Sequence, residues 1–273
     1  MKSLITLCGL ILSLAFLPLG TAQETPSTPP ADKAQPSQAN WWKQRNESLN
    51  KNLKENPCDL LFIGDSITQG WEGAGKDVWS QYFAPFNASN FGISGDRTEQ
   101  VLARMEESKL ETPHAPKVCV IMIGTNNTGH YKAKQSPEDT AAGIKAIAKG
   151  FTNKFPKTQV ILLNIFPRGA NPEDALRIHN QKINDILNKW KEKNVRVVDI
   201  GHIFLKEDGT FKPGMTGDRL HFTKLGYGEW ASALVPYLKK YFPQIEAIDK
   251  EAKTANAKAA QEAKEKKETP VKA

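Results

Sequence analysis

Nearly continuous apolar runs are the feature that most constrains how this chain can fold. They occupy Asp59–Ile63 (DLLFI), Val118–Ile123 (VCVIMI) and Gln159–Phe166 (QVILLNIF). A strand that is apolar at successive positions has both faces buried, which is typical of parallel sheets covered by helices on each side. Weaker strand-like runs lie at Asn87–Phe91 and Val195–Ile200. The chain therefore predicts an α/β fold built on a parallel sheet.

Helical patterns separate these runs. Asp96 and Thr223 are expected to cap the helices that they begin, and Ile178 is expected to face the core. Strands that alternate with helices in this way predict a three-layer α/β/α sandwich. The predicted helices span Trp41–Leu53, Asp96–Ser108, Ser136–Phe155, Asn171–Asn194 and Thr223–Phe242.

The two ends of the chain differ in composition from this central region. Met1–Ala22 has a basic second residue, an apolar stretch and small residues at its end, which favours a cleaved signal peptide over a membrane anchor. We therefore expect a secreted or periplasmic protein. Gln23–Ala39 is rich in Pro, Ser and Thr and is expected to be a disordered linker. Gln244–Ala273 is a Lys/Glu/Ala-rich low-complexity tail, either a solvated helix or disordered. Asn40–Pro243 is expected to be a single domain.

Charge and composition argue against several classes of partner. The formal net charge of +7 is spread along the chain, so no nucleic-acid partner is expected. The histidines lack the clustered spacing of metal ligands, so no metal site is expected. Gly70–Lys76 (GWEGAGK) resembles the start of a phosphate-binding loop, but Asp77 stands where such a loop needs Ser or Thr. We therefore expect no cofactor.

Two cysteines, Cys58 and Cys119, remain after the predicted signal peptide. An exported protein permits a disulfide between them. Their positions at strand starts favour two buried thiols, because side chains on neighbouring parallel strands seldom have the geometry of a bridge. The sequence leaves the pairing open.

A serine follows the first predicted strand directly, in GDSITQGW at Gly64–Trp71. Ligands of parallel α/β sheets bind beyond the carboxyl ends of the strands, so the Ser66 hydroxyl is expected to face the crevice there. The first amides of the following helix favour negative charge nearby. A plain helix cap is the alternative interpretation of Ser66. Asp65 is expected to brace the turn.

Two further motifs supply hydrogen-bond donors, FGISGD at Phe91–Asp96 and GTNN at Gly124–Asn127. Gly95 lacks a Cβ, so its amide can approach a substrate oxygen closely. The Asn126 side chain is a neutral donor suited to a developing oxyanion. Either motif alone would indicate only an ordinary turn. With the amide of Ser66 they form a candidate oxyanion hole, and Asn127 is expected to support it.

The motif DRLH places Asp218 and His221 three residues apart. Their side chains can face one way across a single turn, so that the carboxylate holds Nδ1–H and Nε2 is free to take the proton of Ser66. A surface pair or half of a metal site is the alternative. A serine nucleophile, a base with its carboxylate and two oxyanion donors are the parts that ester hydrolysis needs.

The four motifs, in this order, resemble the SGNH (GDSL-type) hydrolase superfamily over nearly all of Trp41–Phe242. The resemblance implies a flavodoxin-like three-layer α/β/α sandwich with a parallel five-stranded sheet. By motif match it implies that Ser66 is the nucleophile, His221 the base, Asp218 its partner, and Gly95 and Asn126 oxyanion donors.

The stretches FGISGDRTEQVLARM, MIGTNN and FPRG resemble one branch of this superfamily, the platelet-activating-factor acetylhydrolase catalytic subunits. That branch includes bacterial secreted esterases, some of which act on acetylated sugars.

We therefore expect a secreted serine esterase that hydrolyses short-chain, chiefly acetyl, esters of small molecules or polysaccharides through an acyl-serine intermediate. Activity should fall as His221 is protonated, which predicts an optimum above neutrality. A lysophospholipase or thioesterase with the same chemistry is one alternative, and a non-catalytic carbohydrate-binding or scaffold protein is another. No stable membrane insertion is expected after signal cleavage. The ester alcohol and acyl length, the oligomeric state, with a homo-oligomer possible, and the role of the tail stay open.

Overall fold

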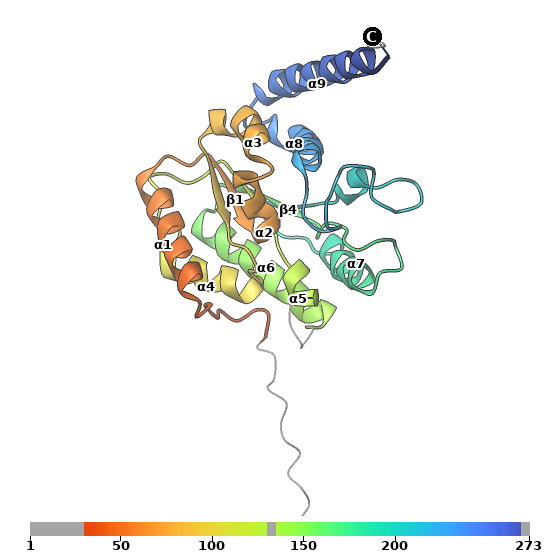
Figure 1. The fold of residues 1–273 in the computed structure, drawn as a ribbon. Coiled ribbons are helices and arrows are strands. Elements are labelled where there is room, and N and C mark those ends of the chain that lie inside the picture. Colours follow the sequence, from red (N-terminus) through yellow and green to blue (C-terminus); the bar gives the residue numbers. More distant parts are fainter. Residues whose placement is uncertain (1–29, 130–134, 269–273) are drawn as a thin grey trace, which may run out of the picture.

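Five parallel strands form the centre of the molecule (Figure 1). The computed structural model describes residues 30–129 and 135–268, with side chains described as far as residue 257, so the predicted signal peptide lies outside the described residues. The strand order is β2-β1-β3-β4-β5, and every pairing is parallel. The strands are β1 (Leu60–Gly64), β2 (Ala88–Gly92), β3 (Val118–Met122), β4 (Gln159–Leu163) and β5 (Val195–Val198).

The register brings the carboxyl ends of three strands together. Gly64, the last residue of β1, pairs with Gly92 of β2 on one side and Met122 of β3 on the other. The segments that follow these three strands carry the GDSI, GISGD and GTNN motifs. The topology therefore places all three motifs at one edge of the sheet, as the sequence predicts.

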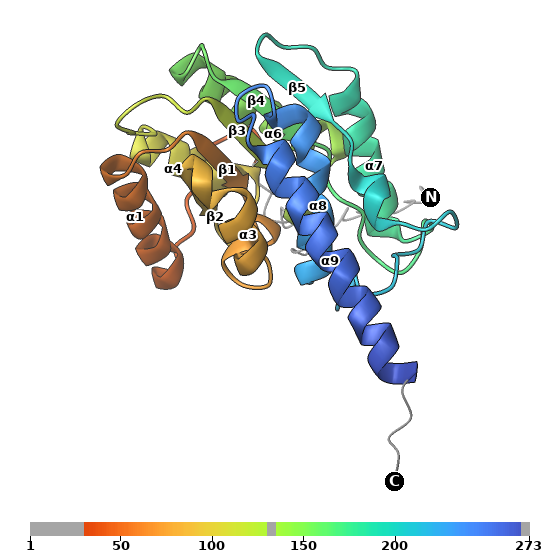
Figure 2. The ribbon, with the colours of Figure 1, turned by 90° about the horizontal axis from the view of Figure 1, so that it is seen from above.

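Alternate side chains of the central strands face two separate cores. In β1, Leu60 and Phe62 face one core, whereas Leu61 and Ile63 face the other. The first core is closed by α3 (Lys76–Tyr82) and α8 (Lys224–Leu238). The second is closed by α1 (Asn40–Glu55), α4 (Thr98–Ser108), α6 (Pro137–Lys154) and α7 (Ala175–Asn188). Figure 2 shows the two layers of helices on opposite faces of the sheet. The predicted three-layer α/β/α sandwich is confirmed.

Two short helices, the long helix α9 and three 3-10 helices make up the remaining described elements. They are α2 (Ser66–Gln69), α5 (Thr125–Gly129), α9 (Ile245–Glu268) and the 3-10 helices Gly70–Glu72, Ala84–Phe86 and Gly201–Phe204. Within the described ranges, no helix combines the length and the apolar content that crossing a bilayer requires.

Of the two helix caps expected above, Thr223 is confirmed and Asp96 is not. The Ser136 side chain accepts a hydrogen bond from the Asp139 amide, and Thr223 accepts one from Gly226. Asp96 was expected to cap α4, but α4 begins at Thr98 and its N-cap is Arg97. The Asp96 carboxylate is instead buried and accepts hydrogen bonds from Trp42 and Arg104. Trp42 of α1 and Arg104 of α4 thus hold this carboxylate in the core.

Helix α7 is shorter than predicted, and its buried face is partly polar. Ile178, expected to face the core, is 44% exposed. Asn180 and Asn184 occupy buried positions of the same helix. Asn184 binds both the amide and the carbonyl of Ile165, in the loop after β4. Ile183 and Leu187 are buried as expected, and only Ile178 was misassigned, because buried asparagines that bind loop backbone do not contribute to apolar periodicity.

Both ends of the predicted domain extend further than Asn40–Pro243. The expected disordered linker does not hold for residues 30–39. The Ala31 carbonyl there accepts a hydrogen bond from Thr98, and the Gln35 amide donates to the Glu99 carbonyl. At the other end, Ile245 and Ala252 of α9 are buried in the first core. Small and apolar residues inside low-complexity stretches are enough to pack these segments on the domain.

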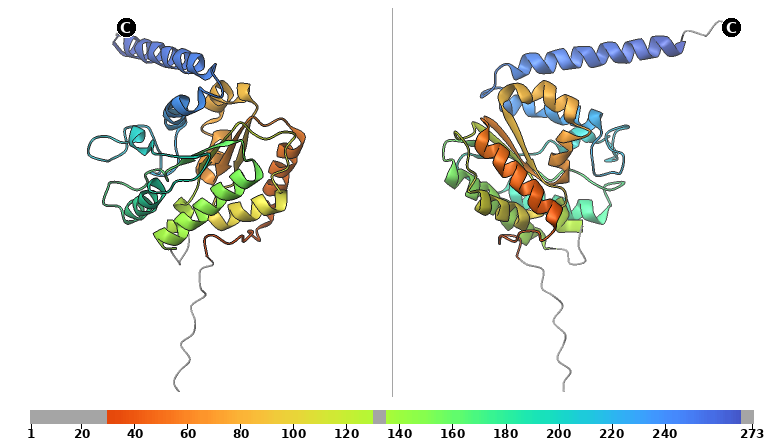
Figure 3. Two further views of the ribbon diagram at one scale, coloured as in Figure 1. Left: turned by 180° about the vertical axis from the view of Figure 1, so that it is seen from behind. Right: turned by 60° about the vertical axis from the view of Figure 1, so that its left-hand side comes forward.

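The two ends of α9 differ in their surroundings. The Tyr82 hydroxyl donates to Asp249 at 2.9 Å, near the start of the helix. Figure 3 shows the rest of α9 extending beyond the body of the molecule. Of the two interpretations of the Lys/Glu/Ala-rich tail, the helix is the one that the structure shows for residues 245–268.

The described cysteines, Cys58 and Cys119, are both buried and both free thiols. Burial raises the pKa of Cys58 to about 11 and raises that of Cys119 as well. These two thiols are therefore protonated core residues, as their positions at strand starts favoured.

Candidate active site

Ser66 is the first residue of α2, the helix that follows β1 directly. Asp65 caps this helix, because its Oδ1 accepts a hydrogen bond from the Ile67 amide at 2.9 Å. On the other side, the Tyr227 hydroxyl of α8 donates to the Ile67 carbonyl at 2.7 Å. Hydrogen bonds to the amide and the carbonyl of Ile67 thus fix the turn that carries the Ser66 hydroxyl.

Gly64 makes this turn sterically possible. A Cβ added there would lie 2.1 Å from Thr68 Oγ1 and 2.4 Å from the carbonyl oxygen of Met122. Backbone oxygens cannot give way to such a contact, so a side chain at this position would push β1 and β3 apart. The end of β1 and the start of α2 therefore pack against β3 only with glycine.

His221 and Asp218 lie in the loop before α8. Asp218 Oδ1 accepts hydrogen bonds from the amides of Leu220 and His221 at 3.0 and 2.7 Å. Arg219 adopts φ 64°, in the left-handed region, and its carbonyl accepts a hydrogen bond from the Gly169 amide at 2.9 Å. Phe222, the next residue after His221, is buried in the first core. An exposed turn is thus anchored on both sides.

The hydroxyl, imidazole and carboxylate form a continuous chain of contacts. Ser66 Oγ lies 2.9 Å from His221 Nε2, and His221 Nδ1 lies 2.7 Å from Asp218 Oδ2. If Nδ1 carries the proton and donates it to Asp218, Nε2 is free to accept the hydroxyl proton of Ser66. The spatial expectation from DRLH and GDSI is met.

Asp218 is held as a carboxylate. Partial burial works against its charge, but the hydrogen bonds from the His221 side chain and from the backbone amides outweigh it, so its pKa lies below the ordinary value. An ionised Asp218 stabilises the imidazolium that would form when His221 takes a proton.

Gly95 and Asn126 lie on adjacent segments of the same edge. Gly95 has φ 78°, which favours glycine, and an added Cβ there would meet nothing within 4 Å. The Asn126 side-chain amide donates to the carbonyl of Asp96, the residue after Gly95, at 2.8 Å. An amide NH2 carries two protons, so this bond fixes the group and leaves one proton to donate. The two predicted oxyanion donors are therefore linked to one another.

Asn127 lies behind the site and joins elements. Its side chain accepts a hydrogen bond from the Thr98 amide at 3.2 Å and donates to Glu99 Oε2 at 3.0 Å. It also donates to Gln135 Oε1. These bonds tie α5 to the start of α4.

Asp65 is fully buried beneath Ser66, and its Oδ2 has no hydrogen-bond partner among the described residues. Burial raises its pKa to about 7, the amide of Ile67 opposes this rise, and the nearby carboxylate of Asp96 adds to it. The prediction that Asp65 braces the turn agrees with its contacts.

A buried ion pair that sequence reasoning missed supports the site from below. Arg104 Nε donates to Asp96 Oδ2 at 2.8 Å, and both side chains are at most 1% exposed. Arg104 also donates to the carbonyls of Phe91 and Gly64, at 3.0 and 3.4 Å. Burial raises the pKa of Asp96 and Arg104 opposes this rise, leaving it at about 6. One guanidinium thus connects the carboxyl ends of β1 and β2.

Arg168, in the FPRG stretch, is a second cation near the site. It donates to the carbonyl and the hydroxyl of Thr125 at 3.1 and 3.2 Å. Burial lowers the pKa of Arg168, and Asp174, Asp65 and Asp218 act against this. The FPRG stretch follows β4 at the same edge of the sheet, so its position could have indicated a residue of the site. The sequence analysis assigned no role to Arg168.

Residues 30–129 and 135–268 contain no group of three or more His, Cys, Asp or Glu side chains that could hold a metal ion. Acyl transfer by a serine, a histidine and an aspartate can proceed with protein groups alone.

Comparison with known proteins places this geometry in a family. The model of the GDSL-like lipase/acylhydrolase family matches residues 62–228. The human platelet-activating factor acetylhydrolase IB subunit alpha1 is 31% identical over 226 residues, which cover 82% of this chain and 94% of that protein. The alpha2 subunit of the mouse enzyme is 36% identical over 191 residues, covering 69% and 79%.

Solved structures show the same fold. A GDSL-like lipase from Bacteroides thetaiotaomicron superposes with a TM-score of 0.60 at 23% identity, covering 72% of this chain and 97% of that one. A catalytic mutant of an acetylxylan esterase from Geobacillus stearothermophilus gives a TM-score of 0.51 at 20% identity, covering 65% and 92%. The family match spans most of the sandwich, and relatives above 30% identity cover over two thirds of the chain. The chain therefore belongs to the GDSL-like lipase/acylhydrolase family, in the platelet-activating-factor acetylhydrolase-like branch of the SGNH hydrolases, and is a carboxylic ester hydrolase.

Proposed function

We propose that the chain is a serine esterase that hydrolyses short-chain, chiefly acetyl, esters through a covalent acyl-serine intermediate. The contact of 2.9 Å between Ser66 Oγ and His221 Nε2 carries this proposal. A hydroxyl is a weak nucleophile by itself, and an adjacent base within hydrogen-bond reach is the arrangement that activates it.

In the proposed reaction, Ser66 Oγ attacks the ester carbonyl carbon and its proton passes to His221 Nε2. The amides of Ser66 and Gly95 and the side chain of Asn126 hold the resulting oxyanion. The bond to the alcohol then breaks, and His221 gives its proton to the leaving oxygen. Water, activated by His221 in the same way, attacks the acyl-serine and releases the acid. Asp218 keeps the imidazole oriented throughout.

The names of two kinds of relative support an acetyl group. The animal proteins are acetylhydrolases of platelet-activating factor, and the Geobacillus structure is an acetylxylan esterase. The two names share the acyl part of the ester and differ in the alcohol. We therefore propose that the acyl site of this chain accepts a small acyl group. The names of the relatives do not indicate a single class of alcohol.

The test compares p-nitrophenyl acetate with p-nitrophenyl decanoate. We expect the purified protein to hydrolyse acetate faster, and Ser66→Ala to lower kcat by at least about 10³-fold. Ser80→Ala, which removes an exposed serine hydroxyl of α3, is the matched control and should keep full activity. Unchanged hydrolysis by Ser66→Ala would show that the ester is cleaved elsewhere. A preference for decanoate would instead favour the lysophospholipase or thioesterase alternative.

We also propose that the protein is exported. The sequence of Met1–Ala22 supports this, with its basic start, apolar stretch and small residues. Amino-terminal sequencing of protein from the periplasmic or extracellular fraction should begin at or near Gln23. Recovery from the cytosol with Met1–Ala22 intact would contradict export without affecting the proposed chemistry.

A further inference from the structure

Arg168, in the FPRG stretch after β4, binds the residue that directly precedes the proposed oxyanion donor Asn126. Its Nη1 group donates to the carbonyl of Thr125 at 3.1 Å and to the hydroxyl of Thr125 at 3.2 Å. Thr125 is the first residue of α5, and both Thr125 and Asn126 are 1% exposed. Two bonds from one guanidinium, one to the backbone and one to the side chain, fix both the place and the orientation of Thr125. Arg168 therefore holds the start of the helix that carries Asn126.

The Asn126 side chain has few contacts of its own to fix its direction. Its Nδ2 donates to the carbonyl of Asp96 at 2.8 Å, and its Oδ1 is buried with no hydrogen-bond partner among the described residues. With one side-chain hydrogen bond, the direction of the second Nδ2 proton depends on where the backbone of α5 lies. Helix α5 has 5 residues, which is too short for a helix to be stable by itself. The direction of that proton therefore depends on bonds that other segments make to α5.

The segments that make such bonds are the FPRG loop and α7. Asn180 of α7 donates to the Thr125 hydroxyl at 3.4 Å, a longer bond than those from Arg168. Its Oδ1 lies 3.0 Å from the hydroxyl of Thr128, one turn further along α5. The bonds from Arg168 come from a charged donor, and such bonds are roughly twice as strong as those between neutral groups. We therefore expect Arg168 to contribute most to the position of Thr125.

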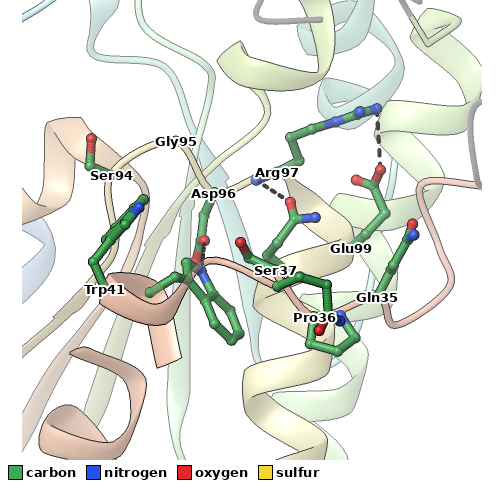
Figure 4. A pocket seen from close by; sticks show the side chains of 12 residues that line it. Gln35, Pro36, Ser37, Trp41, Ser94, Gly95, Asp96, Arg97 and Glu99 are labelled. Carbon is green, nitrogen blue, oxygen red and sulfur yellow. Dashed lines mark hydrogen bonds and ion pairs between the residues drawn. The ribbon is translucent and has the colours of Figure 1, made fainter. Parts of the chain in front are cut away.

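The acceptor of the Asn126 bond is fixed independently of Arg168. The Asp96 carbonyl belongs to loop 94–97, which borders a pocket of about 390 Å³ (Figure 4). The carboxylate of Asp96 accepts hydrogen bonds from Trp42 at 2.6 Å and from Arg104 at 2.8 Å, and all three side chains are buried. The Asn126 side chain is thus held between a loop that the core fixes and a helix whose first residue a guanidinium fixes.

The backbone of the FPRG loop is held by α7 and not by the Arg168 side chain. Arg177, which is 8% exposed, donates to the Arg168 carbonyl at 2.6 Å and to the Gly169 carbonyl at 3.1 Å. Gly169 has φ 77°, and a Cβ added there would lie 2.2 Å from the side chain of Asp174, the N-cap of α7. Replacing the Arg168 side chain should therefore leave the loop in place and remove only its bonds to Thr125.

We propose that Arg168 is a positioning residue of the esterase reaction, whose guanidinium holds Thr125 and thereby directs the Asn126 amide toward the oxyanion. The inference rests on the proposed function and on the oxyanion role proposed there for Asn126. The oxyanion forms only as the ester carbonyl is attacked, so a misdirected Asn126 stabilises the transition state less and leaves substrate binding as it was. The loss should therefore fall on kcat, with KM nearly unchanged.

The experiment is a double-mutant cycle of Arg168 and Asn126, measured as kcat and KM on p-nitrophenyl acetate. We expect Arg168→Met, which keeps a long side chain, to lower kcat by about 10–100-fold and to change KM by less than about twofold. Added to Asn126→Ala, the same change should lower kcat no further, because no amide remains to be directed. Arg168→Lys should recover part of the loss, since an ammonium still donates. Arg196→Met, which replaces an exposed arginine of β5, is the matched control and should keep full activity.

Three kinetic outcomes overturn the inference. Full kcat in Arg168→Met would mean that α5 keeps its place without the guanidinium. An equal loss in the presence and absence of the Asn126 side chain would mean that Arg168 acts by another route, such as its own charge. A loss confined to KM would make Arg168 a substrate-binding residue.

Urea unfolding of each variant establishes that the rates belong to folded protein. If Arg168→Met does not fold, Arg168→Lys takes its place in the cycle, with a smaller loss of kcat expected and the same outcomes deciding. The proposed function is tested separately by the unmodified protein and by Ser66→Ala. No hydrolysis by the former, or full hydrolysis by the latter, would reject the proposed function and this role with it, whereas the three kinetic outcomes reject the role of Arg168 alone.

Discussion

The two halves of the active site are built in opposite ways. On the side of Ser66, the supporting side chains Asp65, Asp96, Arg104 and Asn126 are all at most 1% exposed. On the other side, the side chains of His221 and Asp218 are 45% and 56% exposed. The proposed nucleophile and oxyanion donors are thus extensions of the sheet's core, whereas the proposed base and its carboxylate lie on a surface turn.

Because of this difference, substitutions on the two sides should change different properties of the protein, its reaction rate or its stability. Donors fixed in the core need no rearrangement when charge develops on a substrate, but every change to them also disturbs packing. The surface turn keeps its shape through backbone bonds such as that from Gly169 to Arg219. Substitutions on the exposed side should therefore affect the reaction alone, and substitutions on the buried side should affect both stability and rate.

The largest effect should come from the exposed side. His221→Ala removes the proton acceptor and is expected to lower kcat on p-nitrophenyl acetate by about 10⁴-fold. Because the His221 side chain is 45% exposed and lies on a surface turn, the thermal midpoint should stay within about 2 °C of the unmodified protein. Thermal unfolding followed by circular dichroism checks this half of the prediction. A large drop in the midpoint would show that the turn supports the fold, contrary to the comparison.

On the buried side, Arg104→Ala should give the largest loss of stability. It leaves the carboxylate of Asp96 buried without its cation, for which about 3–5 kcal/mol of unfolding free energy is expected. Urea unfolding at neutral pH measures the loss. The double variant Asp96→Asn with Arg104→Met serves as the control and should recover part of it, because no unpaired charge remains. A single variant as stable as the unmodified protein would mean that water reaches this pair.

Asn126→Ala should affect both quantities together. Loss of an oxyanion donor costs about 10²–10³-fold in kcat. The same change leaves the Asp96 carbonyl without its buried donor, at about 1–3 kcal/mol of stability. Kinetics on p-nitrophenyl acetate and urea unfolding of one preparation test the two effects. If stability falls while kcat holds, Asn126 is a structural residue and the oxyanion is held by other groups.

The smallest effect concerns pH. Burial raises the pKa of Asp65 to about 7 in the folded protein, so the fold holds a proton that the unfolded chain has lost above about pH 4. The contribution of Asp65 to stability is therefore fully present at low pH and lost as the pH rises toward 7. Asp65→Asn removes this dependence. Its stability relative to the unmodified protein should improve by about 1–3 kcal/mol between about pH 5 and pH 8, measured by urea unfolding. A difference that stays constant over this range would place the Asp65 pKa near its ordinary value.

The parts of the fold that rest on local patterns were predictable from the sequence. The runs DLLFI and VCVIMI are buried strands, and the three motifs after neighbouring strands meet at one edge as expected. Ser66 and His221 lie in contact although 155 residues separate them. This was foreseeable because the four motifs together demand one arrangement.

The parts that depend on distant partners were not predictable. Nothing local distinguishes an Asp96 that caps a helix from one that binds Trp42 and Arg104 in the core. Likewise, Asn184 is buried because it satisfies the backbone of Ile165, a partner that helical periodicity cannot reveal. The packing of Ala31 and Ile245 was not predicted either, because both residues lie in low-complexity stretches of the sequence.

Gly64 and Ser66 of the GDSI motif are subject to different constraints, one of packing and one of chemistry. In the proposed reaction the serine is the nucleophile, whereas the glycine is required because Met122 and Thr68 leave no room for a side chain. A descendant of this chain that had lost ester hydrolysis could exchange Ser66 freely and would still keep Gly64. A chain that keeps this glycine but lacks the hydroxyl two residues later would therefore share the fold without the proposed chemistry.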